Sequence, residues 1–211
     1  MTAMCDVAFL LLTFFMLATK FKPQEPVHVE TPKSISDIML PGKNIMLITV
    51  GAEGKVFFAI DDTNLSPGKS ARKELIDTIY ARHGWKISDV EEKSFNSGPS
   101  IGIPFSQLQN FLTANSTEQK ALIDAAPGIP VDTAIDNPKN ELADWIRAAR
   151  SVNPYLRICI KADKSTNYPS VHKIIKTLEE LKIFTFNLIT SLEMKPNAYY
   201  DAHPEERANK K

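Results

Sequence analysis

The segment Met4–Met16, with the sequence MCDVAFLLLTFFM, decides the architecture of this chain. In the first nineteen residues only Asp6 and Cys5 carry ionisable side chains, and Val7–Leu12 is an unbroken apolar run. Nineteen residues of α-helix measure about 28 Å, close to the roughly 30 Å hydrocarbon core of a bilayer. The segment therefore predicts a single membrane-spanning helix over residues 1–20.

A cleaved signal peptide is an alternative interpretation of the same segment. Such a peptide has basic residues before its apolar run and small residues before the cleavage site. Here no Lys or Arg precedes the run, and Asp6 stands at its start. A lipoprotein signal needs a cysteine after the apolar run, whereas Cys5 precedes it. The pattern favours an anchor that remains in the membrane.

Asp6 is the informative residue of this helix, because a carboxylate in hydrocarbon costs on the order of 3 kcal/mol. At 100° per residue, Thr2, Asp6, Thr13 and Lys20 lie within about 40° of one another. Such a polar stripe should face protein or trapped water rather than lipid. Burial disfavours the charged carboxylate, so Asp6 is a candidate proton carrier, with Thr13 on the same pathway. The alternative is that Asp6 only marks the start of the helix at the lipid headgroups.

Met4–Met16 resembles the membrane helix of the ExbD/TolR family of biopolymer transport proteins, which opens with Asp and ends its aliphatic run in Phe-Met. Val27–Pro32 resembles the extended stretch that follows, with Thr31 where Leu is usual. Arg157–Lys164, the helix through Leu181 and the strand after it resemble the C-terminal strand–helix–strand of the family. These matches occur in the family's order and cover less than half of the chain.

The resemblance implies an α+β fold: one N-terminal transmembrane helix, then a small periplasmic α/β-sandwich domain of ExbD/TolR type with a long helical insertion. It implies a bacterial inner-membrane protein whose C-terminal domain is periplasmic. The expected partners are an ExbB-like multi-helix membrane ring, a TonB-like periplasmic protein and a second copy of this chain as a homodimer. This chain and the ExbB-like ring together would be a proton-driven motor of the TonB system, with protons as the coupling ion. Asp6 takes the place of the family's functional Asp.

The chain is expected to fall into four parts. Four prolines make residues 21–43 an extended linker between the helix and the soluble domain. The periplasmic domain is expected over residues 44–192, with an insertion at about 62–136, and a polar tail over 193–211.

Hydrophobic periodicity and turn residues predict the elements of the soluble part. The expected strands are 44–50, 55–60, 155–161 and 183–189, the first two forming a hairpin. The expected helices are 69–83, 105–113, 116–125 (capped by Ser116 and Gln119), 138–152 (capped by Asn137) and 169–181, with 61–68, 85–104 and 127–136 irregular.

Lys20 and Lys22 follow the predicted membrane helix, and positive-inside counting alone would place the soluble domain in the cytoplasm. The family has the opposite orientation. We expect that the natural start lies upstream of Met1 and adds a basic cytoplasmic tail.

Composition excludes several classes of function. The 25 basic residues balance 25 acidic ones, so nothing favours nucleic-acid binding. A mean hydropathy of −0.18 excludes a polytopic membrane protein. Two cysteines, Cys5 and Cys159, cannot form a disulfide framework.

Motifs for catalysis and ligand binding are weak. Gly68-Lys69-Ser70 lacks the upstream glycine of a P-loop. Ser100 lies in a G-x-S-x-G pattern without the flanking strand and helix of a nucleophile elbow. The four histidines lack metal-ligand spacing, and Cys159 has no nearby cysteine. We expect no catalytic residue, no cofactor, no metal and no enzymatic activity.

Asp163 and Tyr168 match the family, but an Asp in a strand-to-helix loop commonly orders that loop by accepting backbone hydrogen bonds. Three alternatives to the motor stay open: a periplasmic binding or interaction module on a passive anchor, a TolR-like role in envelope integrity, and a hydrolase that rests on Ser100 alone.

Overall fold

The computed structural model describes residues 2–18, 29–31, 33–34, 44–61, 64–66, 69–98, 100–134, 137, 139–189 and 191–192. Most of the predicted linker 21–43 and all of the predicted tail 193–211 lie outside the described residues. The described helices are α1 (Thr2–Ala18), α2 (Ala71–His83), α3 (Asp89–Ser97), α4 (Phe105–Thr113), α5 (Ser116–Ala125), α6 (Glu141–Val152) and α7 (Tyr168–Glu180). The described strands are β1 (Lys33–Ser34), β2 (Ile45–Val50), β3 (Val56–Ile60), β4 (Asn64–Ser66), β5 (Lys69–Ser70), β6 (Arg157–Ala162), β7 (Phe186–Ile189) and β8 (Ser191–Leu192).

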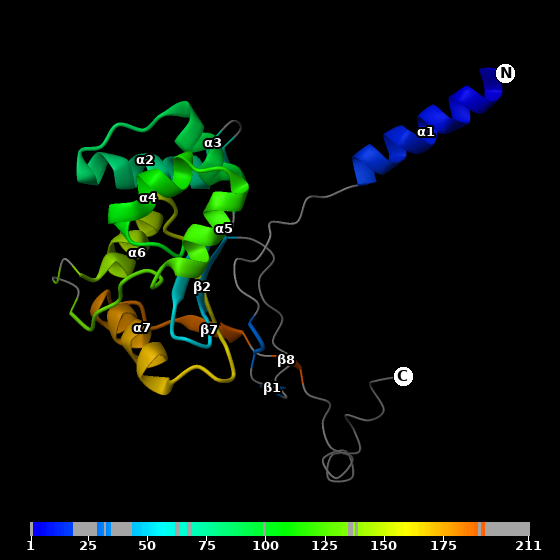
Figure 1. Ribbon diagram of the computed structural model, residues 1–211. Helices are drawn as coiled ribbons and strands as arrows, with labels where there is room; N and C mark the ends of the chain where they lie inside the picture. The colour runs from blue at the N-terminus through cyan, green and yellow to red at the C-terminus, as the bar shows by residue number, and fades with distance from the viewer. Residues whose placement is uncertain are drawn as a thin grey trace, which may run out of the picture.

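A four-stranded sheet in the order β3-β2-β6-β7 forms the centre of the soluble body (Figure 1). The predicted hairpin is present: β2 and β3 are antiparallel, and the turn between them closes with Gly54 N donating to Gly51 O at 2.9 Å. Gly54 has φ +78°, a conformation that glycine adopts without the steric cost other residues carry. Strands β2, β6 and β7 run parallel.

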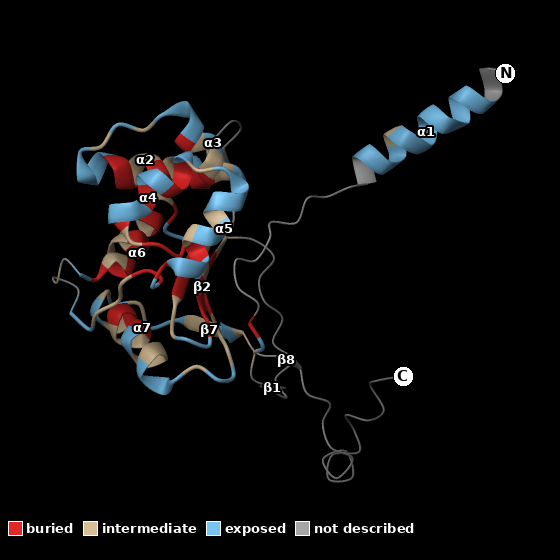
Figure 2. Ribbon diagram, in the orientation of Figure 1, coloured by how far each residue is buried: buried red, intermediate tan, exposed pale blue. Residues whose placement is uncertain are grey.

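Alternate residues of the central strands enter the hydrophobic core, as expected for a period of two. Met46 and Ile48 of β2 are fully buried, as is Ile160 of β6. Helices α2, α6 and α7 pack with the sheet, and Trp145 of α6 stacks on Phe58 of β3 with ring centroids 5.4 Å apart. Figure 2 shows the buried residues gathered between the sheet and these helices. The mixed α+β class predicted from sequence is confirmed.

The segment that contains α2 to α5 shares this core and also covers the outer side of β3. Ile101 exchanges two backbone hydrogen bonds with Phe58, at 2.7 and 2.8 Å, and Ile129 N donates to Val56 O at 2.9 Å. Gly102 lies so close to the Phe57 ring that an added Cβ would meet it at 2.1 Å. The β3 edge of the sheet is therefore already hydrogen-bonded to other residues of this chain.

Three expectations for this region are corrected. Residues 85–104 were expected to be irregular but contain α3, which a capping box between Ser88 and Glu91 starts. The cap of α5 is Asn115 with Glu118, one residue before the expected pair. The loop expected at 61–68 contains β4, which pairs with β5, so the helix expected from residue 69 begins only at Ala71.

Helix α6 begins later than predicted. Asn140, not Asn137, is its N-cap, and its Oδ1 accepts from Ala143 N at 3.3 Å. The amide of Asn140 also donates to Asp132 O at 2.7 Å and to Thr177 Oγ1 at 3.2 Å. Asn137 instead accepts from Lys139 N in the turn before the helix. The tertiary contacts of Asn140 decide where α6 starts.

Helix α1 is separate from this body (Figure 1). It has 17 residues, whereas the sequence predicts a membrane helix over residues 1–20. In the part of the chain that the structure describes, no helix combines the length and apolar character required to cross a bilayer.

Candidate functional site

The polar face of α1 is the first candidate site, and two residues define it. Asp6 and Thr13 are seven residues apart, which is two helical turns and about 10 Å along the axis. Both therefore lie on one face of the helix, as predicted. Asp6 is exposed, and the Thr13 side chain is half-buried, with its hydroxyl donating to Leu10 O at 2.9 Å. In this hydrogen bond Thr13 is the donor, so its oxygen is able to accept a further one.

The remainder of α1 is an exposed apolar surface, and Figure 2 shows it as exposed along the described side chains. Nine large apolar side chains are between 52% and 81% exposed: Met4, Val7, Phe9, Leu10, Leu11, Leu12, Phe14, Phe15 and Met16. Monomeric soluble proteins rarely leave so large a continuous apolar surface in water. Asp6 and Thr13 therefore place one carboxylate and one hydroxyl on a helix whose other described side chains are mainly apolar and exposed.

Asp163 forms the second candidate site, where the segment 29–31 meets the loop between β6 and α7. Its Oδ1 accepts from Ser165 N at 2.9 Å and from Ser165 Oγ at 2.5 Å, and its Oδ2 accepts from Glu30 N at 2.9 Å. Lys164 N donates to Glu30 O at 2.8 Å, and the Lys164 ammonium pairs with the Glu30 carboxylate. Beside them Val29 is buried. We call this junction the linker clamp.

Hydrogen bonds determine the electrostatics of the linker clamp. The pKa of the Asp163 carboxyl is lowered by the hydrogen bonds that it accepts, first from the hydroxyl and amide of Ser165 and then from the amide of Glu30. The Glu30 carboxylate raises the pKa of Lys164 by hydrogen bonding and by its charge. Asp163 orders its loop as expected, and it also holds a segment 133 residues earlier in the chain. The Glu30 contact was not predicted, because no local pattern links residues so far apart.

The other candidates weighed from sequence remain apart from these sites. Tyr168 is 71% exposed, and its ring lies 5.6 Å from that of His172. Ser100 follows the helix α3 rather than a strand, so the backbone of a nucleophile elbow is missing there. Burial raises the pKa of the Cys159 thiol, and a hydrogen bond from Asn187 partly opposes this effect. Among the described residues, no group of three or more His, Cys, Asp or Glu is arranged to hold a metal ion.

Comparison with known proteins identifies the family. The model of the family described as "Biopolymer transport protein ExbD/TolR" matches residues 1–193, which is most of the chain. None of the curated proteins and none of the solved structures matches significantly. The match includes both α1 and the linker clamp. The chain therefore belongs to the ExbD/TolR family of biopolymer transport proteins.

Proposed function

We propose that this chain is a motor subunit that couples the proton-motive force to transport across the outer membrane. Asp6 is the protonatable intramembrane residue, and Thr13 lies on the same proton pathway. The observation that carries the proposal is one carboxylate on an otherwise apolar, exposed helix in a chain of the ExbD/TolR family. The subunit performs no enzymatic reaction of its own and uses protons as its coupling ion.

The proposed location is the bacterial inner membrane, with residues 1–20 as the membrane segment and the α/β body in the periplasm. Family membership supports this location, and so does the exposed apolar surface of α1. A multi-helix ring of the ExbB type would surround two copies of α1, because a single helix cannot enclose a polar pathway. A TonB-like protein would receive the motion on the periplasmic side.

Alternate charging of Asp6 provides the driving step. A carboxylate is disfavoured in an apolar environment, so a change in its protonation changes which surroundings the helix prefers. One elementary charge moved through 100 mV releases about 2.3 kcal/mol, so several steps must add to perform large work.

The linker clamp is the proposed route from the helix to the body. Val29–Thr31 is the first part of the chain after α1 whose contacts with the body are described. Glu30 is held there by two backbone hydrogen bonds and one ion pair to neighbouring residues of a single loop. A displacement of α1 would therefore act on the β6–α7 loop before any other described part of the body.

Exchange of the membrane segment tests this function against a passive anchor. Residues 1–20 are replaced by an unrelated single-span helix without acidic residues, and membrane content and uptake through an energised outer-membrane receptor are measured. The motor requires loss of uptake at normal membrane content. A second exchange then places Asp and Thr at positions 6 and 13 of the foreign helix, and partial recovery is expected. Full uptake with the first exchange would contradict the motor and favour the passive anchor.

A further inference from the structure

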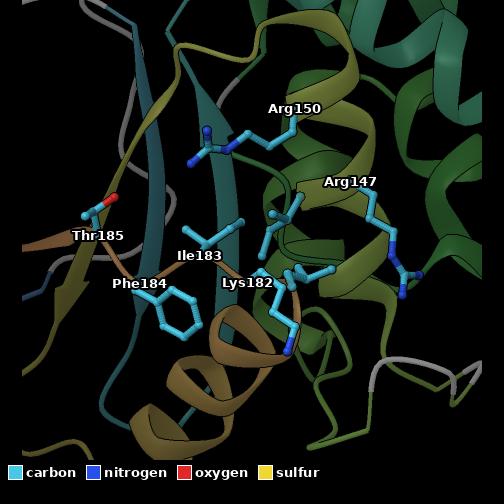
Figure 3. A pocket seen from close by; sticks show the side chains of 8 residues that line it. Arg147, Arg150, Lys182, Ile183, Phe184 and Thr185 are labelled. Carbon is cyan, nitrogen blue, oxygen red and sulfur yellow. The ribbon is translucent and has the colours of Figure 1, made fainter.

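A groove between α6 and the start of β7 is unused by the proposed mechanism. Two adjoining hollows of about 510 and 600 Å³ share Arg150, Phe184 and Thr185, so they form one continuous depression, which we call the α6–β7 groove. Figure 3 shows the first hollow, with Arg147 and Arg150 on α6 and Lys182 and Phe184 on the loop that leads into β7.

The α6–β7 groove is strongly basic although the chain as a whole is neutral. Arg147, Arg150, Arg157 and Lys182 line it, and no carboxylate does so among the described residues. Asp144 pairs with Arg147 at 3.1 Å from outside the lining. Arg150 donates to Pro154 O at 2.7 Å, while its buried Nε has no hydrogen-bond partner in the described structure. The groove therefore favours a ligand with several negative charges.

Two aromatic side chains add an apolar component to this charge. Phe184 is 70% exposed and Tyr155 is 83% exposed, and both line the groove. Aromatic residues and arginine are the types most enriched in protein–protein interfaces. A ligand that fits must therefore offer apolar side chains as well as carboxylates, which a simple inorganic anion does not.

The position of the groove in the sheet points to a polypeptide. The groove reaches Phe186 and Asn187 at the start of β7, and among the described strands β7 lies at an edge of the four-stranded sheet. The opposite edge strand, β3, already has backbone hydrogen bonds from Ile101 and Ile129. An edge strand offers backbone donors and acceptors that an extended peptide satisfies.

We propose that the α6–β7 groove binds an extended acidic segment of a partner protein. Its carboxylates face Arg150, Arg157 and Lys182, and an apolar side chain packs on Phe184. This deepens the proposed function by giving the chemistry of the periplasmic partner. It rests on that function only for the identity of the partner, because a peptide-binding assay contains no proton gradient.

Fluorescence anisotropy with the full chain in detergent micelles tests the proposal. The probe is a labelled ten-residue peptide that alternates Glu with Leu, and its control carries Gln in place of Glu. We expect the acidic peptide to bind and the control peptide to bind at least about tenfold more weakly. Raising the salt from about 50 to about 300 mM should weaken binding, because the groove charges are near the surface.

Charge-reversed variants locate the binding site. Lys182→Glu combined with Arg157→Glu changes two exposed groove residues and should weaken binding about tenfold. Arg82→Glu combined with Lys86→Glu applies the same charge change on the exposed surface near the end of α2 and should leave affinity unchanged. Phe184→Ser tests the apolar contact without changing charge. Circular dichroism checks that each variant is folded.

Three outcomes would overturn the proposal. The first is equal binding of the two peptides, and the second is equal loss with the groove variants and their control. The third is binding of vesicles with anionic lipid that the groove variants abolish, with no binding of the acidic peptide. That result would assign the groove to a membrane surface.

Discussion

Helix α1 and the α/β body place the same kinds of side chain in opposite surroundings. Nine apolar side chains of α1 are 52% to 81% exposed, whereas Trp145, Tyr80, Phe57 and Phe58 of the body are at most 1% exposed. The core of the body is packed by residues of the body itself. Among the described residues, none covers the apolar surface of α1, and for this reason the proposed function places α1 in a membrane with partner helices.

The largest expected effect contrasts Trp145 with Phe15. Trp145 packs against Phe58, Phe95 and Phe105, so Trp145→Ala should lower the free energy of unfolding by about 3–5 kcal/mol. Phe15→Ala on α1 should change it by less than about 0.5 kcal/mol. Denaturant unfolding of the full chain in detergent, followed by circular dichroism, measures both. Equal losses would mean that α1 packs on the body.

A second pair of substitutions tests the same difference between the body and α1, with a smaller expected change in the free energy of unfolding. Gly102→Ala forces a Cβ against the buried Phe57 ring, so we expect a loss of about 1–3 kcal/mol. Ala8→Val enlarges an exposed position on α1 and should leave the stability of the body unchanged. The same unfolding measurement applies, and Ser106→Ala on the exposed side of α4 is the surface control. If Gly102→Ala left the free energy of unfolding unchanged, that result would contradict the close approach of Gly102 to Phe57 of β3.

The linker clamp joins the two regions and should respond to pH. The pKa of Asp163 is lowered in the folded chain, so its stabilisation is present above the unfolded-state pKa of about 3.9 and is lost as pH falls through the lowered value. Hydrogen exchange at Glu30 N should therefore stay slow down to pH values below about 4. In Asp163→Ala it should be fast at every pH, because the acceptor is gone. Equally slow exchange in this variant would show that Asp163 does not hold the segment.

The smallest expected effect concerns Thr13. Thr13→Val removes a hydroxyl from α1 but keeps the shape of the side chain, so uptake should fall partially while the stability of the body is unchanged. Thr113→Val is a matched control, because the Thr113 hydroxyl also donates to carbonyls of its own helix, at 3.0 and 3.1 Å. Full uptake with Thr13→Val would remove Thr13 from the proposed pathway and leave Asp6 as its single member.

The sequence was sufficient for features with a strong local signal. The central hairpin and helix α7 were predicted from periodicity and turn residues. The role of Asp6 was inferred from its unusual place in an apolar run and stays a prediction. Helix α3 was missed because Glu91 and Phe95 are its only buried residues, too few for an apolar stripe. The capping pair Ser88 and Glu91 was the available signal.

Contacts between distant residues left no such signal. Glu30 meets Asp163 across 133 residues. The α6–β7 groove combines Arg147 and Arg150 on one helix with Arg157 and Lys182 from two later segments. Each of these side chains alone is an ordinary surface charge. Only the parallel arrangement of β6 and β7, with α6 beside them, brings them to one groove.

The most direct test of the central claim is uptake through an energised outer-membrane receptor in cells that carry Asp6→Asn. Asn retains the size and polarity of Asp but cannot cycle a proton. Asp124→Asn, the same change at an exposed position of α5, is the control, and membrane content of both variants is measured first. The motor predicts that Asp6→Asn abolishes uptake at normal membrane content and that Asp124→Asn does not. Normal uptake with Asp6→Asn would contradict the motor and leave Asp6 as a helix-end residue.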